Sequence, residues 1–538
     1  MAVIDVSNTP LAKYWRAIRE SPKGMYNGRM FFTVFVYALS GSSKGWDEGS
    51  ALSITQLKSF QREFHVSPDR NPDALSNIVS LVNLGCGVGA FLSFLFNDRL
   101  GRRWALRMYA AVVVVGVLIS TFSYGSLVAL YFGRLITGLG IGALTVTGPM
   151  SIVEVAPRLT RGLMTLWFNI AMLSSQVIGV FVVYGTSRHV SDRLNLQWQT
   201  PFFVQTLVPT LAFVLSFFAQ ESPRWLCLRG RTVEAFDSLA RLRGYGDEES
   251  RRDDPELLAE FDSISGPIER ELAEYGKDTL LSSLRVTFGV RSNLRRVQLT
   301  IAAYILAQMS GGNSITNYLP SIFGYVGVDG SDAKLYSSGF YALTKLGCCV
   351  LASLFFVDAL GRRKSLFVGI TIQMFCHVYL GAFLNRLGAD AHVSVGASRM
   401  AIAVIYIHAL GWAVGLYSLP YLFGAELWPT RIRSFGGALS AGFHWLFLFA
   451  ITKATPSLLS SMHKWGAFIF FAAWCLIALV YAFVMVPETS GRNLESMNQL
   501  FEHKWYEMRK HAYDSPVPSG KEDLEHVERG EETARTIV

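Results

Sequence analysis

Three charged side chains lie inside apolar stretches of this sequence, where a charge is unfavourable unless it has a partner or a function. Asp47 closes a stretch rich in small residues, Arg134 lies within the glycine-rich run 133–140, and Lys345 lies within the apolar run 342–349. A buried carboxylate or guanidinium is strongly destabilising unless it is paired. We therefore predict that Asp47 and Arg134 are partners, and that protonation of Asp47 releases Arg134 and changes which conformation is favoured.

Other readings of this pair stay open at the level of sequence. Asp47 and Arg134 could form a static ion pair that only orders their helices. Glu48 is a rival proton site, although helical geometry places it one residue off the cavity face. Lys44, three residues before Asp47, could satisfy that carboxylate instead of Arg134.

Lys345 bears on the class of substrate. It precedes Asp358 by about 20 Å of helix at 1.5 Å per residue, which is too deep for its ammonium to reach the end of the helix near Asp358. An intramembrane cation that faces a cavity is a candidate site for an anion, and together with His444 it could hold a carboxylate. Lys345 could instead pair with a protein carboxylate or reach the outer interface, and His444 could equally be a hydrogen-bonded packing residue.

These side chains must be held by membrane-spanning helices. Of the 538 residues, 51% are hydrophobic and 17% are charged, whereas roughly a quarter are charged in soluble domains, which excludes an ordinary soluble enzyme. Apolar runs of about twenty residues predict an all-α polytopic membrane protein. Twelve spans are expected, near 30–50, 76–96, 104–124, 127–148, 163–185, 201–219, 298–327, 336–357, 365–386, 401–424, 435–456 and 465–486.

Basic residues predict the orientation of the chain. Arginine and lysine gather in the loops after the second, fourth, eighth and tenth spans, and the positive-inside rule assigns these loops and both termini to the cytoplasm. A plasma-membrane location is expected. The net charge of +8 follows from this topology and from contact with anionic lipid, and it requires no nucleic acid.

The chain is expected to divide into five segments. Two six-helix bundles are separated by a linker that is rich in charges of both signs and contains helix-like stretches, which predicts an intracellular helical insert. The expected segments are a cytoplasmic N-terminal segment at 1–29, a bundle at 30–219, the insert at 220–297, a second bundle at 298–486 and a cytoplasmic tail at 487–538.

Two motifs occur twice in the same order, which indicates two parallel repeats. D-x-L-G-R-R at 98–103 recurs at 358–363, and E-x-x-P-x-x-x-R at 154–161 recurs at 426–433. Transporters of this build bind solute between their halves near the midplane. The arginines alone could merely obey the positive-inside rule, but the repeated carboxylates and spacing predict a cytoplasmic gate of charge-assisted bonds. Its predicted members are Asp98, Arg102, Arg103, Glu154, Arg161, Glu221, Arg224, Asp358, Arg362, Arg363, Glu426, Arg433 and Glu488.

Eight motifs in a fixed order carry a family resemblance. They are NDRLGRR, GRLITGLGIG, EVAPRLTRG, ESPRWLCLRGR, QMSGGNSITNYLPSIF, FVDALGRR, GAELWPTRIRS and PETSGRNLE. With them the sequence resembles the sugar porter branch of the major facilitator superfamily over nearly everything between its first and last spans. Within this branch it is most similar to fungal quinate permeases and related sugar and sugar-acid carriers, through WDEGS in span one and the lysine of span eight. The resemblance implies the major facilitator fold and function as a monomer.

The resemblance also implies roles for individual residues. In proton-coupled members an Asp at the position of Asp47 accepts the proton, and an Arg at the position of Arg134 modulates it. Ala307, Asn317, Tyr421 and His444 replace residues that are usual in hexose carriers, which argues against glucose as the substrate. With Lys345 added, the predicted substrate-binding residues are Asn169, Gln176, Gln308, Asn313, Tyr318, Lys345, Tyr421, His444 and Trp445.

The glycine pair at 311–312 is a predicted hinge of span seven. A break there would let the helix bend and expose backbone to the cavity. Tyr318 and Phe323 would then form part of an outer gate.

Transport is expected to be driven by a gradient, because the sequence has no G-x-x-x-x-G-K-[ST] motif to bind a nucleotide. We predict a proton-coupled importer of a sugar, polyol or sugar acid, with solute, proton and membrane lipids as partners and with no cofactor or metal. A facilitative uniporter is the first alternative. A non-transporting nutrient sensor is the second, although the tail after Pro487 is short for a sensor, and a membrane-embedded enzyme is the least favoured.

Overall fold

The computed structural model describes residues 19, 25–66, 71–157, 160–245, 254–275, 280–352, 362–389, 394–417, 428, 432–486 and 501. Four predicted site residues lie outside these ranges: Asp358, Tyr421, Glu426 and Glu488. The side chains of Arg362 and Arg433 also lie outside the described part of the chain.

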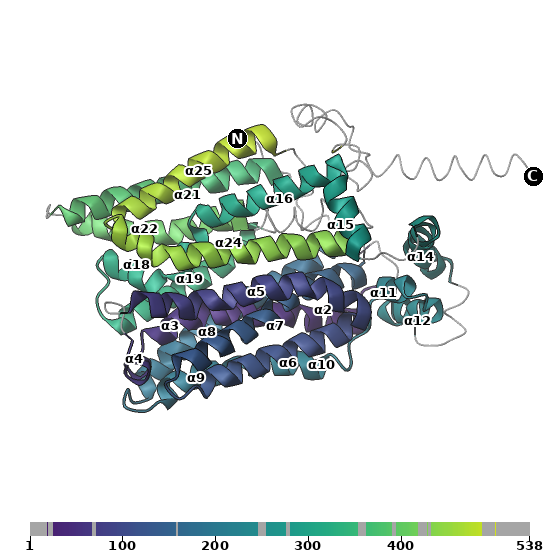
Figure 1. Ribbon diagram of the computed structural model, residues 1–538, viewed down its shortest axis with the longest axis horizontal. Helices are drawn as coiled ribbons and strands as arrows, with labels where there is room; N and C mark the ends of the chain where they lie inside the picture. The colour runs from purple at the N-terminus through teal and green to yellow at the C-terminus, as the bar shows by residue number, and fades with distance from the viewer. Residues whose placement is uncertain are drawn as a thin grey trace, which may run out of the picture.

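The helices gather into two halves that lie against each other along their length, purple to blue and teal to yellow in Figure 1. The first half contains α2 (Gly28–Ala38), α3 (Ser42–Thr55), α4 (Lys58–Phe64), α5 (Pro72–Leu100), α6 (Arg102–Thr121), α7 (Leu127–Val155), α8 (Arg161–His189), α9 (Leu196–Gln205) and α10 (Leu207–Leu215). The second half contains α16 (Arg291–Met309), α17 (Gly312–Asn317), α18 (Leu319–Tyr325), α19 (Ser331–Leu351), α21 (Arg362–Gly388), α22 (Val395–Trp412), the π-helical turn η5 (Ala413–Tyr417), α24 (Arg433–Ser461) and α25 (Trp465–Met485).

Each of the twelve predicted spans coincides with one or more of these helices, and within the described residues every regular element is helical. Eight described helices are long and apolar enough to cross a membrane: α5, α6, α7, α8, α21, α22 with η5, α24 and α25. The other four predicted spans are interrupted, carry polar residues, or continue beyond the described residues. Span one, for example, consists of α2 and α3 joined by a 3-10 turn at Leu39–Gly41.

Span seven breaks where the glycine pair predicted a hinge. The helix α16 ends at Met309, and Gly311 follows with φ of +81°, a conformation that glycine adopts without strain. A Cβ at Gly311 would lie 2.6 Å from the Phe471 ring, so close packing also requires glycine here. The Ser310 carbonyl, which the break frees from the helix, accepts a hydrogen bond of 2.8 Å from Nε2 of His377.

The predicted insert forms helices at one end of the molecule. They are α11 (Pro223–Leu228), α12 (Thr232–Leu242), α14 (Pro255–Tyr275) and α15 (Leu280–Gly289). Figure 1 shows α11, α12 and α14 beyond the ends of the long helices, and we call this end of the bundle the insert end. The helix α12 packs against α14 through Leu239 and Leu257. The five segment boundaries and the cytoplasmic location of the insert end stay predictions.

Candidate functional site

The helix α3 is fixed against α8 by close contact between backbones. A Cβ at Gly45 would lie 1.7 Å from the carbonyl oxygen of Met172, and one at Gly49 would lie 2.2 Å from that of Gln176. Only glycine permits this approach. The three charged residues of α3 therefore point away from this seam, toward α5, α7 and the second half.

Asp47 and Arg134 are partners, as the sequence predicted. Arg134 donates from Nη1 and Nη2 to the two carboxylate oxygens of Asp47, and its Nε donates to the carbonyl of Ile78 at 2.9 Å. The two side chains are buried. A bidentate pair of this kind satisfies both charges in an apolar environment. The role of the pair in proton coupling stays a prediction.

Glu48 lies between two lysines that come from different halves of the molecule. Its carboxylate is 3.4 Å from Nζ of Lys44, one helical turn earlier in α3, and 3.7 Å from Nζ of Lys345 in α19. Lys44 also donates to Asn83 at 3.2 Å, and Lys345 donates to Gln176 at 3.3 Å. Lys345 therefore pairs with a protein carboxylate, one of the alternatives left open by the sequence. The spacing of Lys44 and Glu48 at i and i+4 could have indicated their pairing.

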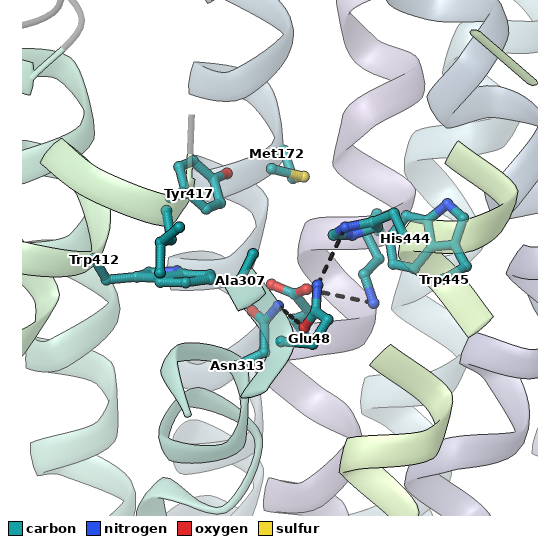
Figure 2. A pocket seen from close by; sticks show the side chains of 11 residues that line it. Glu48, Met172, Ala307, Asn313, Trp412, Tyr417, His444 and Trp445 are labelled. Carbon is teal, nitrogen blue, oxygen red and sulfur yellow. Dashed lines mark hydrogen bonds and ion pairs between the residues drawn. The ribbon is translucent and has the colours of Figure 1, made fainter. Parts of the chain in front are cut away.

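A pocket lies beside this cluster, between the two halves. In this conformation it is nearly closed, with a cavity volume of about 20 Å³, room for about one water. Figure 2 shows Trp412 and Tyr417 on one side of the pocket and His444 and Trp445 on the other. The lining residues are Lys44, Glu48, Met172, Ala307, Gln308, Asn313, Trp412, Leu416, Tyr417, His444 and Trp445.

Amide groups in the pocket are ordered by a chain of hydrogen bonds. Asn313 donates to Oε1 of Gln308 at 2.8 Å, and Nε2 of Gln308 lies 3.2 Å from Nδ1 of His444. Because the Gln308 oxygen accepts from Asn313, its amide nitrogen donates to His444. Lys44 lies over the Trp445 ring, 4.7 Å from its centroid. Amides, an imidazole and aromatic faces are the groups that replace water around the hydroxyls and ring of a polyol.

The structure brings together only part of the predicted substrate site. Gln308, Asn313, His444 and Trp445 line the pocket. The predicted Asn169, Gln176, Tyr318 and Lys345 are not among its lining residues. Gln176 and Lys345 bond to each other, and the Tyr318 hydroxyl donates to the Thr452 carbonyl at 2.8 Å. Sequence comparison missed Met172, Trp412, Leu416 and Tyr417, because apolar and aromatic residues in a span look alike whether they face a pocket or the core.

A second, smaller pocket adjoins the first through Lys44 and Glu48, which line both. The expectation that Glu48 lies off the cavity face is therefore wrong, because the cavity follows the side of α3 that carries Lys44 and Glu48. Asp47 lines this second pocket and is not among the lining residues of the first. The remaining residues of the second pocket are Ala51, Leu52, Val79, Val82, Asn83 and Asn317. The Lys44–Glu48 pair therefore separates the space beside Asp47 from the space that could hold a solute.

Part of the predicted gate is assembled at the insert end. Arg102 bonds both carboxylate oxygens of Glu154 at 2.8 Å and lies 3.3 Å from Asp98. The Glu221 carboxylate accepts from the backbone nitrogens of Arg102 and Arg103 at 2.9 and 3.2 Å, and burial raises the pKa of Glu221. This network ties the first half to the start of the insert.

Apart from Asp98, the remaining predicted gate residues lie outside this network. Asp98 reaches the second half, where it accepts a hydrogen bond of 3.3 Å from Ser434. Arg363 donates to the Phe483 carbonyl at 2.8 Å within the second half. Arg161 is exposed, and Arg224 is half-buried. The action of these residues as a gate stays a prediction.

Comparison with known proteins places these features in context. A family model described as "Sugar (and other) transporter" matches residues 33–501. The probable quinate permease of Aspergillus terreus is 29% identical over 499 residues, covering 90% of this chain and 89% of that protein. The quinate permease of Neurospora terricola is 28% identical over 503 residues, covering 90% of this chain and 91% of that protein.

Solved structures show the same fold. The proton:xylose symporter XylE bound to 6-bromo-6-deoxy-D-glucose matches with a TM-score of 0.73 at 22% identity, covering 88% of this chain and 100% of that one. The inward-open form of the xylose transporter XylE from E. coli matches with a TM-score of 0.68 at 20% identity, covering 88% and 99%. The predicted major facilitator fold is confirmed.

Proposed function

The chain belongs to the sugar transporter family of the major facilitator superfamily, and from this premise we propose that it carries a polyhydroxylated carboxylate, such as quinate or a sugar acid, by alternating access coupled to protons. The family assignment makes it a multi-pass membrane transporter and not an enzyme. The solute class and the coupling are the parts that we propose.

The charge balance around the pocket carries the proposal for the solute. Lys44, Lys345 and Arg134 face the carboxylates of Asp47 and Glu48, so these five side chains have a net charge of +1 when all are ionised. An uncompensated buried charge is unfavourable. A solute with one carboxylate neutralises the cluster, whereas a neutral sugar leaves the charge in place.

The pocket wall supports the other half of the proposal, a polyhydroxylated ring. Gln308, Asn313 and His444 can exchange hydrogen bonds with hydroxyl groups, and the faces of Trp412 and Trp445 can cover the apolar side of a ring. The relatives in Aspergillus terreus and Neurospora terricola are named for quinate, a ring that combines hydroxyls with one carboxylate.

Proton coupling is proposed for the Asp47–Arg134 pair. Asp47 lines the second pocket, so a proton can reach it without passing through the bidentate bond to Arg134. A proton on Asp47 removes the negative charge that holds Arg134, which frees the guanidinium for other partners and changes the relative energy of the two conformations. The structural relative XylE is a proton:xylose symporter.

The membrane context completes the proposal. The transporter acts as a monomer in the plasma membrane, with both termini and the insert end in the cytoplasm. The Arg102–Glu154 network then lies at the inner face, where it holds the helices of the first half together during closure.

The function is tested by uptake into cells that express the protein. Labelled quinate, galacturonate, glucose and xylose are supplied at two external pH values, with and without an uncoupler. We expect one of the two acids to accumulate, faster at the lower pH, and accumulation to disappear with the uncoupler. Entry of neutral hexoses alone would contradict the proposed solute class. Acid uptake that ignores both pH and uncoupler would indicate a uniporter.

A further inference from the structure

Glu48 occupies the place where the carboxylate of a solute would be most stable. It lines the pocket, and its side chain is 12% exposed, whereas those of Lys44 and Lys345 are almost fully buried. One carboxylate thus serves two ammonium groups, at distances of 3.4 and 3.7 Å. Neither distance is that of a tight charge-assisted hydrogen bond, so the carboxylate is divided between the two lysines.

The two lysines differ in their access to the pocket. Lys44 lines the pocket, and its other partners, the Asn83 amide and the Trp445 ring, carry no negative charge. Lys345 is not among the lining residues; it bonds to the Gln176 amide and lies 5.5 Å from the centroid of the Tyr417 ring. An anionic solute that enters the pocket therefore meets Lys44 first.

The two ion pairs also differ in what they connect. Lys44 and Glu48 both belong to α3 in the first half, so their pair leaves the halves independent. Lys345 belongs to α19 in the second half, so its pair with Glu48 joins the halves beside the pocket.

We propose that Glu48 occupies the position of the solute's carboxylate while the site is empty. The carboxylate of an anionic solute then replaces Glu48 as the partner of Lys44, and Glu48 pairs with Lys345 alone. This inference rests on the proposed function and deepens it by naming Glu48 as the residue that distinguishes an anionic solute from a neutral one. The loaded site has two lysines and two carboxylates, so it is neutral and the exchange needs no proton. Arrival of the anion strengthens the bond between the halves.

The exchange explains how acids and neutral sugars would be distinguished. A neutral ring can occupy the pocket, but it has no charge with which to displace Glu48 from Lys44, and so it does not strengthen the Glu48–Lys345 pair. Discrimination then lies in closure of the halves as well as in binding. This is specificity by induced fit, in which only the correct ligand provides the energy for the conformational change.

The test is a set of binding and transport measurements on purified, full-length protein. Binding of quinate and of neutral myo-inositol is measured for the wild type, Glu48→Gln, Lys345→Gln and the double variant. Asp192→Asn makes the same change of charge at an exposed site and serves as the control. Thermal unfolding and gel filtration show whether each variant is folded.

Each variant has its own expected result. Glu48→Gln removes the competitor and binds quinate about tenfold more tightly. Its quinate turnover in liposomes falls, because the Glu48–Lys345 ion pair between the halves is lost. Lys345→Gln leaves Glu48 wholly to Lys44 and binds quinate about tenfold more weakly. The double variant regains quinate binding, because Lys44 is free again. Inositol binding stays within about twofold throughout.

Two results would overturn the inference while leaving the proposed function intact. In one, the double variant binds quinate no better than Lys345→Gln, which would make Lys345 itself the ligand of the solute. In the other, Glu48→Gln is folded but loses quinate and inositol alike, which would make Glu48 a structural residue. A wild-type protein that binds inositol but not quinate would overturn both the inference and the proposed function.

Discussion

Asp47 and Glu48 are adjacent carboxylates with separate partners. Asp47 bonds to Arg134 within the first half, and Glu48 is shared between Lys44 and Lys345. Because consecutive residues of a helix point about 100° apart, Asp47 and Glu48 belong to two separate ion clusters although they lie in the same helical turn. We assign proton coupling to the first cluster and recognition of the solute's charge to the second.

Replacement of Asp47 by Asn separates these two roles. An amide cannot gain or lose a proton in this pH range, but it can still accept a hydrogen bond from Arg134. We expect Asp47→Asn to abolish accumulation of quinate against its gradient while quinate exchange across the membrane continues. Accumulation in cells and counterflow in liposomes measure the two properties. Full accumulation by the variant would show that Asp47 is not the proton site.

The pairing of Asp47 with Arg134 could be predicted from the sequence, whereas the pairing of Lys345 could not be chosen from it. Two unlike charges in neighbouring apolar spans have few other partners, so their types and positions suffice. Lys345 had an anion, a protein carboxylate and the outer interface as alternatives, and the choice depends on how α19 packs against α3. Spacing within one helix contains no information about that packing.

At the level of elements, breaks in two spans supply part of the pocket wall. The break before α17 places Asn313 at the pocket, and the π-helical turn η5 does the same for Leu416 and Tyr417. Non-helical backbone is tolerated at membrane depth where it lines a cavity or is buried in protein. The glycine pair revealed the first break in the sequence, but no residue type distinguishes a π-helical turn, and η5 was not predicted.

Replacement of Gly311 by Ala tests the break in span seven. An L-residue at a φ of +81° is strained by about 1–2 kcal/mol, and the new methyl group would collide with the Phe471 ring. We expect a lower unfolding temperature in detergent and slower transport. Gly347→Ala in α19 is the matched control, because nothing lies within 4 Å of the added Cβ. Equal stability of the two variants would contradict a structural requirement for the break.

At the scale of the whole molecule, the duplicated motifs and apolar runs predicted two helical halves, and the structure contains them. The Arg102–Glu154 network could be anticipated from the spacing of its motifs. The pocket could not be delimited in the same way, since Trp412 and Met172 come from different halves and meet only in the folded bundle. The proposed solute class depends on how the two halves pack together, because the net charge of +1 arises from residues of α3, α7 and α19.

The proposed mechanism depends on a solute carboxylate that binds Lys44 in the pocket between the halves. The most direct measurement is an experimental structure of the full-length protein with quinate bound. We predict the quinate carboxylate within about 4 Å of Nζ of Lys44, the usual limit for an ion pair, with Glu48 retained by Lys345. A quinate whose carboxylate lies away from Lys44, or whose ring lies outside the residues that line this pocket, would contradict the account.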